Sequence, residues 1–534
     1  MRRRTILTTA ALGAAGLGAA GLGAVGLARP SMARAPANTL RFVPYVNLTS
    51  LDPVWTVTGA TLSYGYMVYD MLYGIDSQFE PRPQMCAGHE ISNDRLTWIF
   101  TLRDGLLFHD NEKVRAIDCV TSLARWAVRD PFGQQLAAAT DEMKPLDDKR
   151  FQIRLKKPFP QMLFALGGRA CFMMPERVAK TPATEQIRES IGSGPFRFLA
   201  REWISGASAT WTKFDKYVPR QEPPANLSGG KLVNLERIEW TVQPDPATGA
   251  AALRTGEVDW LEMPMIDLVP ALKSAGGITV EVINPWGQLC VIVFNHLYPP
   301  FDNPKLRRAL LPAIDQKVFI QAVVGDQTEF GRTPVGYFTD GTPMATKAGL
   351  EVLTGPRDIA LAKRLIAESG YKNEPILMMS PTDFPLHGQL GQVARGLFIE
   401  LGLNIDFVEM DFGSEVVRRQ NSSPPSKGGW NCAPQTWTVL NSSNPGNSQA
   451  LRASGKSGTF GWAADETLEA LRQQWFDAPD LPSQLAIAEQ TQRRGLEILP
   501  QLPLGRVYPP AAFRDNVKDI IKAPYPIFWG VRKV

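Results

Sequence analysis

The residue types that could carry out catalysis form no recognised local motif in this chain. Gly455-Lys456-Ser457 resembles the end of a phosphate-binding loop, but that motif needs a glycine where the chain has Ala450. No G-x-S-x-G or H-E-x-x-H segment is present. The sequence therefore predicts no catalytic residues and a protein that is not an enzyme. An active site can also be built from residues that are far apart in the sequence, and such a site leaves no local motif. An exported hydrolase with a dispersed active site is therefore the alternative.

Metal ligands are equally sparse. The four histidines include no pair at i, i+4 spacing. The cysteines are widely spaced and lack a C-x-x-C pair: Cys86, Cys119, Cys171, Cys290 and Cys432. We expect no metal site and no cofactor, and most cysteines buried. Nickel held through a small chelator, and one or two long-range disulfides, stay open.

The most informative stretch is 94–111, DRLTWIFTLRDGLLFHDN. Polar and apolar side chains alternate from Thr97 to Leu102, which is the pattern of a strand with one aromatic face. Asp104-Gly105 then supplies turn residues. The stretch is therefore expected to form a strand followed by a turn.

The charge of the chain is concentrated at its start. Residues 1–35 carry five arginines and no acid, so removing them turns the formal charge of +4 into about −1. A nearly neutral protein lacks the positive charge that nucleic acid or an anionic membrane would attract. We expect neither as a partner.

Residues 1–35 also have the pattern of a secretory signal peptide. An apolar stretch runs from Leu7 to Ala28, and Ala33-Arg34-Ala35 is a cleavage candidate. Arg3-Arg4 resembles the twin-arginine export motif, which predicts a soluble periplasmic protein after cleavage. The alternative is an uncleaved membrane anchor, although the six glycines between Gly13 and Gly26 disfavour a helix there.

The rest of the chain alternates helical and strand patterns, as α/β proteins do. Helices are predicted at 61–73, 116–128, 246–254, 304–311, 358–368 and 391–401. Strands are predicted at 39–46, 151–155, around Glu202, and at 208–214, 237–243, 258–261, 289–294, 376–379 and 404–409. Pro312 is expected to split the helix that begins at Pro304. The stretches 421–429 and 441–458, rich in Ser, Asn, Pro and Gly, are expected to be surface loops.

Six segments in order make the chain similar to family 5 of the extracellular solute-binding proteins, the dipeptide, oligopeptide and nickel type of ABC importers. They are LTWIFTLRDGLLFHD (96–110), LKKPFP (155–160), GSGPFRF (192–198), ALRTGEVDW (252–260), FNHLYPPFDNPKLRRAL (294–310) and AKRLIAESGY (362–371). The resemblance implies a type II (cluster C) periplasmic binding protein fold, and a monomer that delivers a small organic solute to the permease subunits of an ABC importer.

The resemblance also implies three lobes. Lobe I would combine 36–72, 193–292 and 509–534, lobe II would be the insertion 73–192, and lobe III would be 293–508. The solute would lie between lobes I and III, which close on it around a hinge.

The ligand contacts that the resemblance implies differ from those of dipeptide-binding members. Such members have an Asp for the ligand's amino group where this chain has Leu440, and an Arg for its carboxylate in a segment where this chain has only His387. Both ends of a dipeptide would stay unpaired, which costs several kcal/mol in a closed cleft. We therefore expect a less zwitterionic solute, held by stacking and neutral hydrogen bonds.

The predicted ligand-binding residues come from both sides of the expected cleft. They are Tyr45, Asn47, Trp286, Phe384, His387, Trp437, Thr438, Asn441 and Ser442. Trp437 and Tyr45 could equally pack in a core or at a sheet edge.

Overall fold

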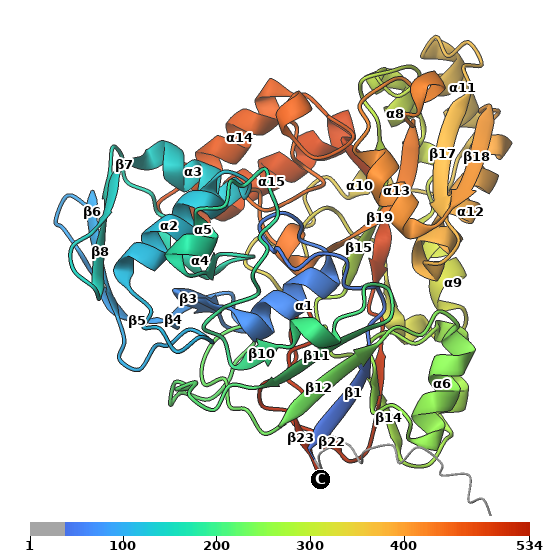
Figure 1. Cartoon of the computed structure of the whole chain (residues 1–534). Coiled ribbons are helices and arrows are strands. Elements are labelled where there is room, and N and C mark those ends of the chain that lie inside the picture. Colours follow the sequence, from blue (N-terminus) through green and yellow to red (C-terminus); the bar gives the residue numbers. More distant parts are fainter. Residues whose placement is uncertain (1–37) are drawn as a thin grey trace, which may run out of the picture. The chain divides into compact units, whose positions relative to one another are not determined.

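The computed structural model describes residues 38–534, so the expected signal segment, 1–35, lies outside the described residues. Three main sheets organise this part of the chain (Figure 1). Their strand orders are β10-β11-β12-β1-β13-β21-β14, β16-β20-β15-β19-β17-β18 and β5-β6-β8-β7. We call them the seven-stranded, six-stranded and four-stranded sheets.

The seven-stranded sheet brings together distant parts of the sequence. Its strands are β1 (Thr39–Val43), β10 (Phe196–Phe198), β11 (Ser208–Lys213), β12 (Arg237–Thr241), β13 (Trp260–Leu261), β14 (Ile278–Glu281) and β21 (Ala511–Arg514). β1 lies between β12 and β13 and is parallel to both, so these three strands end at the same edge of the sheet. One face packs on α1 (Gly59–Val68), and the other on α6 (Pro246–Thr255) and α7 (Val269–Lys273).

The six-stranded sheet is built around the apolar run predicted as a buried strand. Its strands are β15 (Gln288–Phe294), β16 (Gly331–Arg332), β17 (Ile376–Pro381), β18 (Ile405–Met410), β19 (Cys432–Thr438) and β20 (Gln501–Val507). β17 is parallel to β18 and β19, so these carboxyl ends also share an edge. The accompanying helices are α8 (Pro304–Ala309), α9 (Gln316–Val324), α10 (Glu351–Thr354), α11 (Ile359–Glu368), α12 (Pro385–Glu400), α13 (Phe412–Arg419), α14 (Glu466–Asp477) and α15 (Leu481–Ile498).

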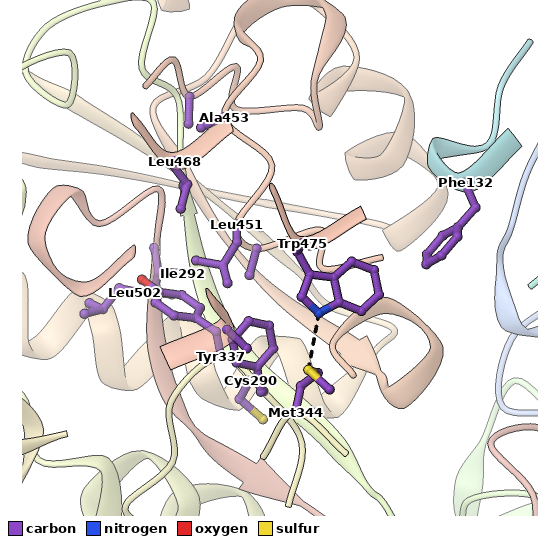
Figure 2. Close-up of a cluster of buried hydrophobic side chains, with 14 of the residues drawn as sticks. Phe132, Cys290, Ile292, Tyr337, Met344, Leu451, Ala453, Leu468, Trp475 and Leu502 are labelled. Atoms are coloured by element: carbon purple, nitrogen blue, oxygen red, sulfur yellow. Dashed lines mark hydrogen bonds between the residues drawn. The ribbon is translucent and has the colours of Figure 1, made fainter. Parts of the chain in front are cut away.

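Apolar side chains join this sheet to the C-terminal helices. Figure 2 shows Ile292 of β15 and Leu502 of β20 near Tyr337, with Trp475 of α14 in the same cluster. The Trp475 indole nitrogen donates a hydrogen bond to the sulfur of Met344 at 3.3 Å, so its polar atom has a partner inside the core.

The four-stranded sheet contains the signature stretch. Its strands are β5 (Cys86–Ile91), β6 (Thr97–Leu102), β7 (Thr140–Pro145) and β8 (Arg150–Leu155), with helices α2 (Ala116–Ala127), α3 (Pro131–Ala139), α4 (Met162–Gly167) and α5 (Glu176–Ala179). Burial alternates along β6 as predicted, with Trp98, Phe100 and Leu102 inside. Gly105 has φ +79°, which confirms the turn after the strand.

Short two-stranded pairs complete the fold. They are β2 (Asp70–Met71) with β9 (Phe172–Met173), β3 (Tyr73–Ile75) with β4 (Pro81–Pro83), and β22 (Val517–Lys518) with β23 (Arg532–Lys533). The His109 ring also ties the signature stretch to a distant loop, because its Nε2 lies 3.0 Å from the carbonyl oxygen of Gly194.

The chain passes between the two larger sheets at two places that lie against each other. Residues 282–287 lead from β14 to β15, and residues 508–510 lead from β20 to β21. Gly287 has φ +61°, and a Cβ atom there would come within 2.4 Å of the carbonyl oxygen of Val507. We call 282–287 and 508–510 the paired crossings.

Three predictions of local structure are wrong. The helix expected at 61–73 ends at Val68, because the chain then extends to pair β2 with β9. A 3-10 turn replaces the strand expected around Glu202. Most of the expected surface loop at 441–458 is buried between 441 and 451. Its polar groups bond internally there, as when Asn444 and Asn447 exchange hydrogen bonds of 2.9 and 3.1 Å.

The helices of residues 38–534 include none with the length and apolar content needed to cross a membrane. Most strands of the three sheets come from the ranges expected for three lobes, but β15 begins at Gln288, inside the range expected for lobe I, and pairs in the six-stranded sheet. The lobe boundaries stay a prediction.

Candidate functional site

A cavity of about 160 Å³ lies where the two larger sheets face each other. The seven-stranded sheet and the loops at the ends of its parallel strands contribute Val43, Tyr45, Gln243, Leu261 and Met263. The facing wall includes α9 and the start of α12, which follows β17. Ligands of α/β proteins bind outside the carboxyl ends of parallel strands, so this crevice is the candidate binding site.

Two aromatic rings meet across this crevice. Tyr45 follows β1, Phe384 precedes α12, and their ring centroids are 5.6 Å apart. Both side chains line the cavity. They are therefore the predicted ligand-binding residues that the structure places most directly at the candidate site.

A band of polar side chains continues from Tyr45. Tyr525 adds to the rise in the pKa of the Tyr45 hydroxyl, so the two phenols are neighbours, and the Tyr525 hydroxyl lies 2.9 Å from Thr438 Oγ1. Asn441 donates a hydrogen bond of 3.3 Å to the same Thr438 oxygen. The Asn441 side-chain oxygen accepts a hydrogen bond from Arg169. The predicted residues Thr438 and Asn441 thus belong to one network.

Arg169 was not predicted from the sequence. Its guanidinium forms an ion pair of 3.3 Å with Asp130, which also accepts hydrogen bonds from the first backbone N–H groups of α3. The positive charge of Arg169 therefore already has a partner within the protein.

Glu262 is a second residue that the sequence did not reveal. It follows β13, and its Oε2 accepts a hydrogen bond of 3.0 Å from the backbone N–H of Tyr45. Burial raises the pKa of Glu262 to about 8. The nearest signal in the sequence is the GEVDW run, whose strand ends just before Glu262, but the pairing with β1 depends on a contact across 217 positions.

His387 lies behind Phe384 and not in the lining of the cavity. Its ring is 4.2 Å from that of Phe384, and its Nε2 is 3.1 Å from Thr436 Oγ1. Burial holds the pKa of His387 well below its usual value, so the ring is neutral. Nearby, Glu415 and Arg419 lie 3.7 Å apart, and burial raises the pKa of Glu415 to about 7.

Of the nine predicted residues, only Tyr45 and Phe384 line the cavity, so Asn47, Trp286, Trp437 and Ser442 lie outside its lining, as His387, Thr438 and Asn441 do. Asn47 accepts a hydrogen bond from the backbone of Gly206, and Trp286 packs on Phe79 in the core. Trp437 donates a hydrogen bond of 2.7 Å to Gln501, and Ser442 is fully buried. A ligand contact for any of these stays a prediction.

Residues 38–534 contain no group of three His, Cys, Asp or Glu side chains arranged to hold a metal ion. The five cysteines are all buried and unbridged. The cavity therefore presents aromatic rings, backbone, neutral polar groups and the side chain of Asp383, and Glu262 lies beside it, between the lining residues Leu261 and Met263.

Comparison with known proteins identifies the family. The profile described as "Bacterial extracellular solute-binding proteins, family 5 Middle" matches residues 80–459. The chain belongs to this family. As a family 5 solute-binding protein it captures a solute, which confirms that prediction, and the hydrolase alternative receives no support.

One relative and two solved structures show the extent of the similarity. The relative is the "Probable peptide ABC transporter periplasmic-binding protein y4tO" of Sinorhizobium fredii, 35% identical over 490 residues, covering 91% of this chain and 92% of the relative. A dipeptide-binding protein from Pseudoalteromonas sp. SM9913 in complex with Met-Leu has a TM-score of 0.78 at 20% identity, covering 93% and 100%. AgaA from A. tumefaciens R10 in complex with agropinic acid has 0.77 at 18%, covering 93% and 99%. The predicted type II periplasmic binding protein fold is confirmed.

Proposed function

We propose that this family 5 protein captures a small organic solute between its two larger sheets and delivers it to the permease subunits of an ABC importer. The observation that carries this proposal is the aromatic contact between Tyr45 and Phe384, made where the strand ends of both sheets converge on one cavity. A solute that reaches this crevice can contact both sheets at once, which stabilises the closed arrangement.

The relative from Sinorhizobium fredii, named as a probable peptide ABC transporter protein, supports the importer role. The signal-like residues 1–35 support export to the periplasm, and their Arg3-Arg4 pair supports the twin-arginine route. We propose a monomer whose three lobes close around the paired crossings.

The solute proposed for this cleft is not an ordinary dipeptide. Leu440 is 2% exposed and packs in an apolar cluster, so it offers no charge to an amino group. Arg169 is already paired with Asp130 and would have to give up that partner to bind a carboxylate. Tyr45, Phe384, Thr438 and Asn441 are the proposed contacts.

The test is a thermal-shift screen over peptides, sugars, opine-like conjugates, aromatic acids and metal chelates. A ligand at 100 times its dissociation constant adds about 2.7 kcal/mol to the stability of the folded protein. Mass spectrometry of the same samples should recover the compound unchanged, since a hydrolase would convert it.

A pair of threonine variants locates the site. Thr438→Val removes the hydroxyl that joins Tyr525 and Asn441, and we expect it to weaken binding by about 10-fold, on the order of one hydrogen bond. Thr255→Val, at the exposed end of α6, is the matched control and should bind as the wild type does. If Thr438→Val and Thr255→Val bind the solute with equal affinity, Thr438 is not part of the binding site. If no compound in the thermal-shift screen stabilises the protein, solute capture in this cavity is contradicted.

A further inference from the structure

Two acidic side chains that flank β13 differ in their charge environment. Asp259 accepts from the Arg41 guanidinium at 3.0 and 3.1 Å and from Lys533 at 2.9 Å. Glu262, three residues later, accepts only the Tyr45 backbone N–H at 3.0 Å, and no lysine or arginine between residues 38 and 534 forms an ion pair with it. Of these two side chains, only Glu262, which stands between the cavity-lining residues Leu261 and Met263, has no cation as a partner in the described part of the chain.

The other charged groups of this region cannot supply that cation. Arg169 is held by Asp130 at 3.3 Å, and Arg419 lies 3.7 Å from Glu415. An unpaired carboxylate that burial desolvates is costly, so it is either neutral or matched by a bound group. The charge that a bound group would have to supply at Glu262 is positive.

The groups around Glu262 suit a cation with apolar substituents. The backbone of Tyr45 holds the carboxylate, while its ring stands 5.6 Å from that of Phe384. The faces of aromatic rings attract alkylated ammonium groups, and a nearby carboxylate adds to that attraction. Burial raises the pKa of Tyr45 and Tyr525 above their usual values, so both phenols stay neutral.

We propose that Glu262 is the counter-charge for a cationic nitrogen of the solute, so that the cargo is an organic ammonium compound. This inference rests on the proposed function and names the chemical class of its solute. It assigns the recognition of positive charge to the seven-stranded sheet, at the end of β13.

The inference predicts a distinctive pH dependence. With a pKa of about 8, Glu262 is mostly protonated in the empty site at neutral pH, and a cation must displace that proton. Affinity should therefore rise by about 10-fold per pH unit from pH 6 and level off near pH 8. The other groups nearby are Tyr45 and Tyr525, which stay neutral, His387, which burial keeps neutral, and Asp383, which is exposed on the facing wall.

The experiment uses two probe pairs, each made of a cationic compound and an uncharged counterpart. Choline, whose quaternary ammonium never titrates, is compared with its uncharged carbon isostere dimethylbutanol, and an alanyl dipeptide amide with its N-acetylated form. Calorimetry in buffers of different ionisation enthalpy measures affinity and the number of protons released. Wild type, Glu262→Gln and Glu281→Gln are compared. Glu281 lies on β14 of the same sheet, bonded to Lys522 at 3.0 Å, and controls for the loss of one negative charge.

We expect the cationic member of at least one pair to bind the wild type at least 10-fold more tightly than its neutral partner, with release of about one proton at pH 6.5. Glu262→Gln should abolish the preference, the proton release and the pH dependence, whereas Glu281→Gln should keep all three. If Glu262 only accepted the hydrogen bond of the Tyr45 N–H, the number of protons released on binding would be the same in Glu262→Gln as in the wild type.

The inference is overturned if neutral probes bind as tightly as cationic ones, if the cation preference survives in Glu262→Gln, or if none of the four probes binds. In each case the thermal-shift screen decides the proposed function separately. A stabilising compound without a cationic group would leave solute capture intact and remove only the assignment of Glu262.

Discussion

At the scale of single residues, carboxylates on this chain have contrasting roles that depend on what faces them. Asp52 lies in a loop after β1 and is 1% exposed, and its two oxygens accept from Arg125 of α2 at 2.7 and 3.0 Å. It also accepts the backbone N–H groups of Val54 and Ile187, each at 3.0 Å. Asp52 therefore fastens the chain near β1 to the helix that covers the four-stranded sheet.

We expect Asp52→Ala to lower the free energy of unfolding by about 3–5 kcal/mol, because Arg125 would remain buried without a counter-charge. Urea denaturation measures the change. Asp141→Ala removes one of the two acidic partners of Arg154 in a pair that is 47% exposed on both sides, and should cost less than about 1 kcal/mol. Similar losses in the two variants would show that Asp52 is not the fastening point.

At the scale of elements, the paired crossings set how the two larger sheets can move. Gly287 ends the first crossing and Val507 directly precedes the second, and a Cβ atom on Gly287 would come within 2.4 Å of the Val507 carbonyl oxygen. Only glycine fits both this approach and the φ of +61°.

Gly287→Ala should therefore separate the crossings and destabilise the protein by about 2–4 kcal/mol, through strain at positive φ together with the clash. Gly277→Ala is the matched control, since Gly277 has φ +77° but only open space within 4 Å of where a Cβ atom would lie, and should cost about 1 kcal/mol. Denaturation gives both values, and small-angle scattering with a stabilising compound shows whether closure changes. If Gly287→Ala and Gly277→Ala lower the free energy of unfolding by the same amount, the close approach of the crossings does not contribute to stability.

Elements with a strong periodic pattern were predictable from the sequence. The alternation in β6, the apolar run of β15 and the amphipathic α2 all form as expected. The stretch 441–458 was misjudged because its Ser and Asn residues satisfy one another when buried, and composition alone does not reveal such a network. Glu262 was missed for a related reason, because its importance depends on the pairing of β13 with β1.

The candidate site was therefore only partly predictable. Tyr45 and Phe384 reach the cavity, and Thr438 and Asn441 join one hydrogen-bond network, but a ligand contact for each of them stays a prediction. Trp286 and Trp437 have the aromatic character of ligand-binding residues and also make core contacts, so a ligand contact for either stays a prediction. Residue type could not separate these outcomes, because large aromatic side chains serve both purposes.

At the scale of the whole molecule, the five thiols belong to the interiors of the four-stranded and six-stranded sheet regions. All five are buried, and burial raises the pKa of each, that of Cys290 to about 12. A thiol reacts as its thiolate, so neither access nor ionisation favours reaction in the folded protein.

A thiol reagent such as DTNB should label none of these cysteines in the native protein, even at pH 9, and all five in concentrated urea. The absorbance change counts them directly. Rapid labelling of a native cysteine would show that its surroundings open far more often than its burial implies.

The contact between Gly287 and Val507 has a practical consequence for observing single molecules. Because the paired crossings contact each other, they form one hinge axis. A single angle then describes the rotation of one larger sheet relative to the other. A donor dye on one of the two larger sheets and an acceptor dye on the other, both far from the hinge axis, would report that angle as an energy-transfer efficiency. The open and closed states would then appear as two separate peaks in the distribution of efficiencies.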